Sequence, residues 1–246
     1  MNRQSIRIFY TFTLSCLSLQ IFADDEHEQA VFYINSPLHP PAVTKKHDGF
    51  EDRLAMELFS RMGFKPEINI VPAERGLINL NQGIDDAILS RVAGLSKLYP
   101  NIVRITEAAN ERKYIAFTRN DIAIKAWADL KDYDVAYISG WKIFNTNVTK
   151  YRSLTKVRGP EQLFYLLDKN RVDVVLYGQA AGQWMIKKLK LENITPVYPP
   201  LANKQKYFYL HKKHAHLVPK ANETLRNIKT DGTYDKLKQQ TLLKHH

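Results

Sequence analysis

The chain has a single cysteine in 246 residues, Cys16, which lies in an apolar segment close to residue 1. From residue 24 onward there is no thiol, which excludes disulfides, thiolate metal sites and cysteine nucleophiles from that part. The sequence also lacks the patterns G-x-S-x-G, H-E-x-x-H, G-x-G-x-x-G and the phosphate-binding P-loop. We therefore expect no catalytic residues and no cofactor, and an enzyme that uses carboxylates in a cleft is a minor alternative.

Acidic residues are scarce, with 25 Asp and Glu against 36 Lys and Arg and a net charge of +11. Loss of Arg3 and Arg7 with residues 1–23 would leave 34 − 25 = +9. Such an excess suggests nucleic acid, acidic surfaces or anionic solutes as partners. The lysines come in separated pairs such as Lys45–Lys46, and no basic helix carries interleaved aromatic residues. We expect a solvated basic surface and no nucleic-acid partner.

Residues 1–23 have the pattern of a secretory signal peptide. Two arginines precede an apolar run over residues 8–22, and Ala23 is followed by three acidic residues. The run is nearly long enough to span a bilayer, so a membrane anchor is the alternative. Its Thr, Ser and Gln residues and the acidic residues after it favour cleavage after Ala23. We predict export to the periplasm.

Cys16 is the residue of this segment that a lipid could modify. A lipoprotein signal would place leucine three residues before the cysteine, but Thr13 stands there and the apolar run continues past Cys16. We interpret Cys16 as part of the apolar centre of the signal peptide, and acylation is a minor alternative.

A helix followed by a short apolar strand is predicted twice. The first copy has a helix over 74–81 that ends at Gly83, and its strand begins at Asp86; the second has a helix over 160–169 that ends at Asn170, and its strand contains Asp173. The aspartates are 173 − 86 = 87 residues apart, too far for a solenoid repeat. Short apolar strands are typical of a parallel sheet covered on both faces. We predict two α/β lobes with a cleft at the carboxyl ends of their strands.

The remaining pattern completes the two lobes. The clearest helix covers 49–63, where apolar residues recur at i, i+4 and i+8 before Gly63. We predict strands at 30–35, 68–71, 114–118, 134–138 and 206–210, and helices at 142–148, 182–189, 219–229 and 233–243. Prolines at 196, 199 and 200 mark the return to the first lobe. Lobe 1 is expected to comprise 24–117 with 205–246 and lobe 2 to comprise 121–200, with hinge strands near Arg119 and 203–206.

Arg91 follows the first repeated strand and is the first candidate ligand residue. A guanidinium matches the geometry of carboxylate and phosphate groups. The alternative is a structural role, in which Arg91 caps a helix or pairs with Asp85. Arg75, at the start of the preceding helix, could point into the same cleft or instead pair with Glu74 or Asp52.

Two aromatic residues and two strand exits supply the other candidates. Trp141 and Tyr177 follow strands of the second lobe and could stack on a ligand, or belong to the lobe core. Gly140 precedes a predicted helix whose backbone N–H groups could approach a ligand. His39 or Leu38 could contact ligand at the exit of the first strand.

Three histidines, His211, His214 and His216, could suggest a metal site. Lysines are interspersed among them, and no carboxylate lies near them in the sequence. We expect a solvated loop and no metal. Asp86 and Asp173 are interpreted through turn chemistry, and not as catalytic residues.

Four stretches resemble, in order, bacterial extracellular solute-binding proteins of family 3, the periplasmic receptors of polar amino-acid ABC transporters. They are DGFEDRLAMELFSRMGF at 48–64, GIDDAILSR at 83–91, DLKDYDVAYISGW at 129–141 and KTDGTYDKL at 229–237. The resemblance spans nearly all of the chain after residue 23. It implies a two-lobed α/β fold of the type II periplasmic-binding-protein kind, whose two hinge strands let a monomer close on a small solute. The expected partner is an ABC permease or, alternatively, a membrane sensor, and some proteins of this fold are lyases.

The chain departs from the family's amino-acid clamp at both ends. The arginine that pairs with the amino-acid carboxylate is usual in a region that here reads Leu98–Tyr99–Pro100, and the aspartate that receives the α-amino group is replaced by Gly178. Arg91 stands where the family commonly has a small polar residue. The resemblance therefore implies a polar or anionic solute without a required α-ammonium group.

Overall fold

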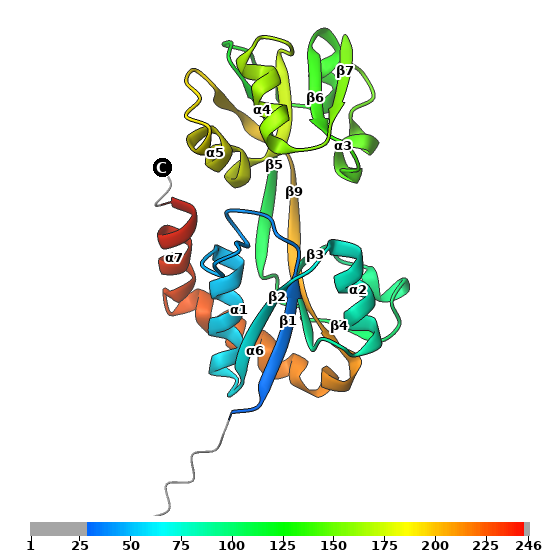
Figure 1. Cartoon of the computed structure of the whole chain (residues 1–246), viewed down its shortest axis with the longest axis vertical. Coiled ribbons are helices and arrows are strands. Elements are labelled where there is room, and N and C mark those ends of the chain that lie inside the picture. Colours follow the sequence, from blue (N-terminus) through cyan, green and yellow to red (C-terminus); the bar gives the residue numbers. More distant parts are fainter. Residues whose placement is uncertain (1–28, 244–246) are drawn as a thin grey trace, which may run out of the picture.

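The computed structural model of the protein describes residues 29–243, which form two α/β lobes arranged along the long axis of the molecule (Figure 1). The predicted signal peptide, with Cys16 and the cleavage point, lies outside the described residues. Across residues 29–243, no helix is long and apolar enough to cross a membrane. The two-lobed α/β fold expected from the sequence is confirmed.

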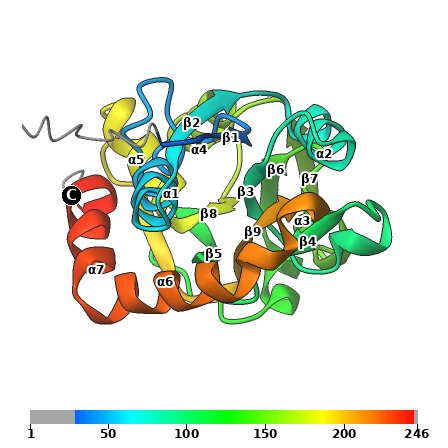
Figure 2. The same ribbon diagram turned by 90° about the horizontal axis from the view of Figure 1, so that it is seen from below.

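Lobe 1 holds the first strands and the last helices of the chain. Its elements are β1 (Val31–Ser36), α1 (Phe50–Arg61), β2 (Lys65–Ile70), α2 (Ala73–Gln82), β3 (Ala87–Arg91), β4 (Ile102–Arg104), α6 (Val218–Thr230) and α7 (Thr233–Lys238), with short 3₁₀ turns at Leu95–Lys97 and Lys212–Leu217 and a π turn at Gln239–Leu243. Helices α1, α6 and α7 pack together on one side of the lobe, and α2 lies on the other (Figure 2).

Lobe 2 repeats the same order of elements. They are a 3₁₀ turn at Trp127–Asp132, β6 (Asp134–Ile138), α3 (Lys142–Asn147), β7 (Ser153–Val157), α4 (Pro160–Asp168), β8 (Val174–Gly178) and α5 (Gln179–Lys188). Two further strands, β5 (Asn110–Thr118) and β9 (Thr195–His211), run side by side between the lobes (Figure 1).

A continuous set of strand pairings joins the lobes in the order β2-β1-β3-β9-β5-β8-β6-β7, with β4 also paired to β9. The pairs within the repeated units, such as β1 with β3 and β6 with β8, are parallel. The pairs made by β5 and β9 are antiparallel. Parallel strands with helices on both faces leave their carboxyl ends free at one edge, and in both lobes that edge faces the other lobe (Figure 1).

The predicted repeat is confirmed in atomic detail. Asp86 Oδ2 accepts from the Tyr33 N–H at 3.0 Å, and Asp173 Oδ2 accepts from the Asp134 N–H at 2.9 Å. In return, the N–H of each aspartate donates to the carbonyl of the residue that it holds. Each aspartate therefore fixes the start of its strand on the neighbouring strand. We expected turn chemistry at these positions, but both carboxylates accept from residues of another strand.

The helix ends before these strands also match. Gly83 and Asn170 both adopt left-handed backbone conformations, with φ of 76° and 53°. Gly and Asn are the residues that take this conformation at the least cost. Gly83 and Asn170 in the sequence were therefore sufficient to predict where these two helices end.

Strand β9 corrects one prediction. We predicted a strand at 206–210 after the prolines at 196, 199 and 200, but β9 runs through all three prolines over 17 residues. Its register against β5 shifts between the pairs Tyr114–Ala202 and Ala116–Val197, so Pro199 and Pro200 fall in an irregular stretch. A residue without an N–H is tolerated there because the ladder is already interrupted.

Other element boundaries also differ from the sequence prediction. Strand β5 begins at Asn110, four residues before the predicted start at Tyr114, and Arg91 belongs to β3, not to the loop after it. Helix α5 begins at Gln179 instead of Gly182, and β4 and β7 were not predicted. The start of β5 is polar on both faces, so hydrophobic periodicity gives no signal there.

Candidate functional site

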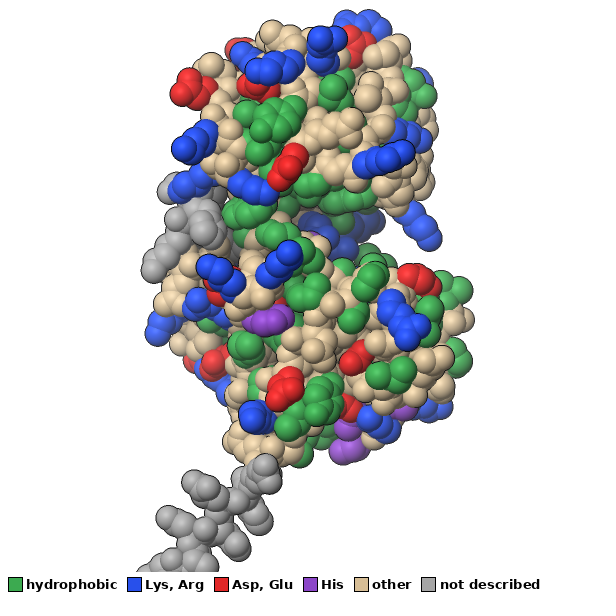
Figure 3. Space-filling view, in the orientation of Figure 1, with side chains coloured by type: hydrophobic (Ala, Val, Ile, Leu, Met, Phe, Trp, Pro, Cys, Tyr) green, Lys and Arg blue, Asp and Glu red, His purple; other side chains and the backbone are tan. Residues whose placement is uncertain are grey.

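Two cavities of about 320 and 500 Å³ lie between the lobes and share the side chains of Arg112 and Trp141. The smaller cavity is lined by the loop after β1, the start of β5, helix α7 and the start of α5. The larger one is lined by α3, β5, Val92 and Lys204. Hydrophobic and Lys or Arg side chains are visible in this hollow between the lobes (Figure 3). Both lobes therefore contribute to one cleft.

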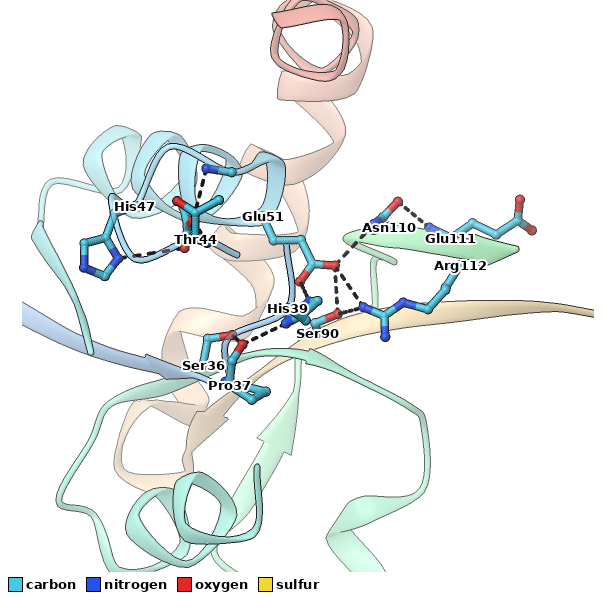
Figure 4. A network of polar contacts seen from close by, with 12 residues as sticks. Ser36, Pro37, His39, Thr44, His47, Glu51, Ser90, Asn110, Glu111 and Arg112 are labelled. Atoms are coloured by element: carbon cyan, nitrogen blue, oxygen red, sulfur yellow. Dashed lines mark hydrogen bonds and ion pairs between the residues drawn. The ribbon is translucent and has the colours of Figure 1, made fainter. Parts of the chain in front are cut away.

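Glu51, in the first turn of α1, is fully buried at the lobe 1 side of this cleft. Four groups from three separate parts of the chain, the loop after β1, strand β3 and strand β5, surround its carboxylate (Figure 4). Ser90 Oγ and Asn110 Nδ2 donate to Oε1 at 2.8 and 3.3 Å, His39 Nε2 lies 3.0 Å from Oε2, and Arg112 Nη2 lies 4.0 Å from Oε1. A buried carboxylate with this many partners is a fixed anion.

The pKa of Glu51 reflects two opposing effects. Burial by itself raises this pKa, but the charge and hydrogen bond of His39, the charge of Arg112 and the hydrogen bond of Ser90 together lower it to about 2. Glu51 is therefore ionised at neutral pH, and its negative charge is part of the site.

The loop after β1 is held so that His39 reaches Glu51. Gly49 packs against this loop so tightly that a Cβ atom there would lie 2.4 Å from the Ala42 carbonyl oxygen. The Glu51 N–H also donates to that carbonyl at 2.8 Å. His39 Nδ1 lies 2.7 Å from the Pro37 carbonyl oxygen, so both ring nitrogens face acceptors. Both can donate in an imidazolium, which would form an ion pair with Glu51.

Arg91, at the end of β3, has no carboxylate partner within the described residues. Its Nη2 donates to the Ala73 carbonyl at 3.2 Å, and its Nε is buried without a hydrogen-bond partner. Burial, with the repulsion of Arg112, lowers its pKa to about 10, although Glu51 acts in the opposite direction. Asp85, the partner considered in the sequence analysis, accepts from Asn35 instead.

Lys206 on β9 is a second buried cation. Its side chain has no ion pair or hydrogen bond with another residue of the described region, and 7% of the residue is exposed. Burial, followed by the charge of Arg112, lowers its pKa to about 8. Lys204 lies two residues earlier on the same strand and lines the larger cavity. The strands that cross between the lobes therefore bring positive charge to the cleft.

Aromatic side chains form the lobe 2 wall. Trp141 stacks on Phe144 with an interplanar angle of 2°, and its ring centroid lies 4.9 Å from that of Tyr177. Tyr114 meets Trp141 edge-on at 6.0 Å. Trp141 lines both cavities and Tyr177 lines the smaller. An aromatic wall of this kind can cover an apolar or planar part of a ligand.

The structure brings together part of the predicted set. His39, Trp141 and Tyr177 line the cavities, and Arg91 lies near enough to interact with the charges of Glu51 and Arg112. Gly178, where the family places its aspartate, lines the smaller cavity.

Arg75 and Gly140 are outside both cavity linings and exposed. Arg75 forms no ion pair within residues 29–243, because Glu74 accepts from Tyr99 and Asp52 accepts from backbone N–H groups. Gly140 forms an exposed turn with φ of 83°, and the helix after it is only six residues long. Neither of these two predictions gains support from the structure.

Sequence reasoning missed five charged or polar residues of the site. They are Glu51, Asn110, Arg112, Lys204 and Lys206. One signal was available, because Glu51 lies on the same helical stripe as the buried Leu54, Ala55 and Leu58. A carboxylate on a buried stripe needs a partner.

The histidine segment also departs from expectation. His214 Nε2 and Lys213 Nζ each lie 2.7 Å from Asp86 Oδ1, so a carboxylate is present although none is near in the sequence. Burial raises the pKa of Asp86, but the hydrogen bonds from Lys213, His214 and the Tyr33 N–H outweigh it and lower that pKa. In the part of the chain that the structure describes, no group of three or more His, Cys, Asp or Glu residues is arranged to hold a metal.

Solved structures with the same fold include transport and sensing proteins. The second substrate-binding domain of GlnP from Lactococcus lactis, in an open conformation, has a TM-score of 0.70 at 18% identity and covers 87% of this chain and 96% of its own. An ancestral arginine-binding protein bound to arginine has a TM-score of 0.65 at 20% identity, with 87% and 98% covered. A histidine kinase sensor domain similar to periplasmic binding proteins has a TM-score of 0.67 at 16% identity, with 88% and 97% covered. At these identities the likeness shows the fold.

Sequence comparison assigns the chain to a family. An uncharacterized protein of Shewanella oneidensis is 26% identical over 204 residues, which cover 79% of this chain and 76% of the relative. The family model for bacterial extracellular solute-binding proteins, family 3, matches residues 34–244. The family resemblance found from the sequence motifs is thereby confirmed. The protein belongs to the bacterial extracellular solute-binding proteins of family 3.

Proposed function

We propose that this protein captures a small anionic or strongly polar solute between its lobes in the periplasm and delivers it to an ABC transporter. The cleft carries this proposal, because both lobes line it and both of its cavities share the guanidinium of Arg112. Guanidinium groups bind carboxylate and phosphate with directed hydrogen bonds. The site requires no metal or cofactor, and the protein acts as a monomer without nucleic acid.

A ligand without an α-ammonium group fits the cleft better than a standard amino acid. The larger cavity is lined by Arg112, Lys142 and Lys204 and by no carboxylate. The smaller one has Glu111 as its single acidic lining residue, beside Arg112, Lys113 and Lys238. An ammonium group needs acceptors or a carboxylate to offset its desolvation. The side chains that line the two cavities therefore favour binding of an anion over binding of a standard amino acid.

A sensing role is the second candidate function. The histidine kinase sensor domain shares the two-lobed fold, and closure on a ligand can signal as well as transport. Genes for a permease and an ATPase beside this one would favour transport, and a sensor kinase gene would favour signalling. The proposal gives no residue a catalytic role. Turnover of a bound solute by the purified protein would overturn this absence of catalysis.

We further propose that β5 and β9 act as the hinge between lobe 1 (24–117 with 205–246) and lobe 2 (121–200). A saturating solute should close the cleft and reduce the radius of gyration, because closure removes the space between the lobes. Small-angle scattering with and without solute measures this change. An unchanged radius of gyration with a solute that demonstrably binds would contradict the hinge.

Export is expected to remove residues 1–23. The basic start, apolar centre and Ala23 support a cleavable signal peptide. Mass spectrometry of the protein from a periplasmic extract should therefore find Asp24 as the first residue. An N-terminus that retains the apolar run, or a lipid on Cys16, would show that the segment is an anchor.

A further inference from the structure

Positive charge in the cleft exceeds what the surrounding protein neutralises. Four cations act on one another at the cleft: Arg112 and Lys204 line the larger cavity, and Arg91 and Lys206 lie outside both cavity linings but close enough for their charges to interact with the others. The buried anion among them is Glu51, and His39 lies 3.0 Å from it with both ring nitrogens facing acceptors. Glu51 carries one negative charge, which can offset at most one of the four cations. At least three of them therefore remain without a buried counter-charge.

Strand register holds two of these cations together. In the antiparallel pair of β5 and β9, Arg112 is directly opposite Lys204, and Asn110 is directly opposite Lys206. Residues directly opposite one another lie on the same face of the sheet, where like charges are unfavourable. Arg112 and Lys204 both line the larger cavity, so this repulsion is directed at the cleft. The fold does not separate the charges.

Burial adds to the cost of this arrangement. Lys206 is 7% exposed, and Arg91 Nε has no hydrogen-bond partner within residues 29–243. A buried cation without a partner destabilises a folded protein, and such groups concentrate at functional sites. The lowered pKa values of both groups agree with this geometry. A ligand that supplies negative charge would remove the penalty.

We propose that the solute of this cleft is a dianion, with two carboxylates or one phosphate- or sulfate-type group, neutralised jointly by Arg91, Arg112, Lys204 and Lys206. This inference rests on the proposed function and narrows its ligand class. One negative charge would leave most of the excess uncompensated, whereas two offset half of the four cations. The aromatic wall of Trp141 and Tyr177 covers the part of the solute that carries no charge.

A matched series of probes tests the number of charges. Isothermal titration at neutral pH compares succinate, its monoamide succinamate and neutral succinamide, and the same comparison is made with benzene-1,3-dicarboxylate, its monoamide and its diamide. Inorganic phosphate and sulfate form a further arm, which distinguishes compact dianions from dicarboxylates. Glycine and glucose represent zwitterions and neutral sugars. The tightest-binding dianion is expected to exceed its monoamide in affinity by at least about tenfold.

Lys206→Met gives a second readout with two effects of opposite sign. Removal of the buried charge is expected to raise the melting temperature of the unliganded protein, because the unpaired ammonium no longer has to be desolvated. The same variant should bind the best dianion at least about tenfold more weakly. Lys187→Met on the exposed end of α5 is the matched control and should change neither value. A lysine with a purely structural role would lower the melting temperature when replaced.

The outcomes separate this inference from the proposed function. If the monoamides, glycine or glucose bind as tightly as the best dianion, the protein binds solutes but the dianion assignment is wrong. If Lys206→Met lowers the melting temperature or leaves dianion binding unchanged, Lys206 does not belong to the ligand site and the inference is also overturned. If no probe of any charge class binds at millimolar concentration, the proposed solute capture fails together with the inference.

Discussion

Replacement of Glu51 by Gln is expected to lower the free energy of unfolding by about 3–5 kcal/mol, the cost of removing one partner from a buried ionic cluster. The amide keeps the size of the side chain but removes the charge that faces His39 and Arg112. Those cations would then lie close together with no anion between them. Urea denaturation of the unliganded protein measures the loss.

Glu57→Gln is the matched control for this variant. Glu57 lies on the same helix but is partly exposed, and its partner Arg61 is four residues away on the surface. The control should change the free energy of unfolding by no more than about 0.5 kcal/mol. A loss at Glu51 no larger than at Glu57 would show that the buried network contributes little to stability.

The dependence of stability on pH gives Glu51 a distinct signature. Its pKa is about 2 in the folded protein and 4.5 in the unfolded reference. Between these values the unfolded chain binds more protons than the folded one, so stability falls as pH falls. The contribution is complete above about pH 4.5 and is lost progressively towards pH 2. The loss of stability that Glu51 causes between about pH 4.5 and pH 2 should be absent in Glu51→Gln and present in Glu57→Gln.

Arg112→Met is expected to weaken binding of the best solute by at least about 30-fold, which corresponds to about 2 kcal/mol, the lower limit for truncating one partner of a desolvated charge contact. Arg112 lines both cavities, so the ligand meets its guanidinium wherever it sits in the cleft. Arg91→Ala should weaken binding by at least about tenfold. Isothermal titration of the wild type and both variants with one solute measures the two effects.

Arg158→Met provides the control for both arginine variants. Arg158 is exposed in the turn before α4 and lies in neither cavity lining, so its replacement should leave the affinity unchanged. The melting temperature of each variant reports whether the fold is retained. Equal affinity of Arg112→Met and wild type would remove Arg112 from the ligand site, and equal affinity of Arg91→Ala would make Arg91 structural.

Local sequence patterns were sufficient for most elements of the fold. The apolar stripe of Phe50, Leu54 and Leu58 predicted a helix at 49–63, and α1 covers Phe50–Arg61. Strand β6 has the predicted bounds of 134–138. These patterns succeed because a helix face or a buried strand is specified by residues close together in the chain.

The longer strands were predicted less well, because their partners decide their length. Strand β9 passes three prolines, two of which, Pro199 and Pro200, lie where its irregular register against β5 leaves positions at which no N–H is required. The polar start of β5 is a strand because β9 pairs with it. Neither effect is visible in a window of local sequence.

The same difference between local and tertiary information separates the site residues that the sequence predicted from those that it missed. His39, Trp141 and Tyr177 were found because each follows a predicted strand, and strand exits in open α/β sheets line the ligand crevice. Arg112 lies in the part of β5 that was not predicted, Lys206 is the first residue of a predicted strand, and Glu51 lies inside a helix, so none of them follows a strand. Nothing in the order of the chain shows that these three side chains influence one another.

The sequence by itself determined the family, the repeated helix–strand unit and the two-lobed α/β fold, because these depend on ordered motifs and on hydrophobic periodicity. The tertiary structure alone decided the charge balance of the cleft. Glu51, Arg112 and Lys206 come from distant parts of the chain, and their pKa values respond to burial and to one another. Electrostatic energies depend on distance in space and on the surrounding dielectric, and only the folded chain supplies either.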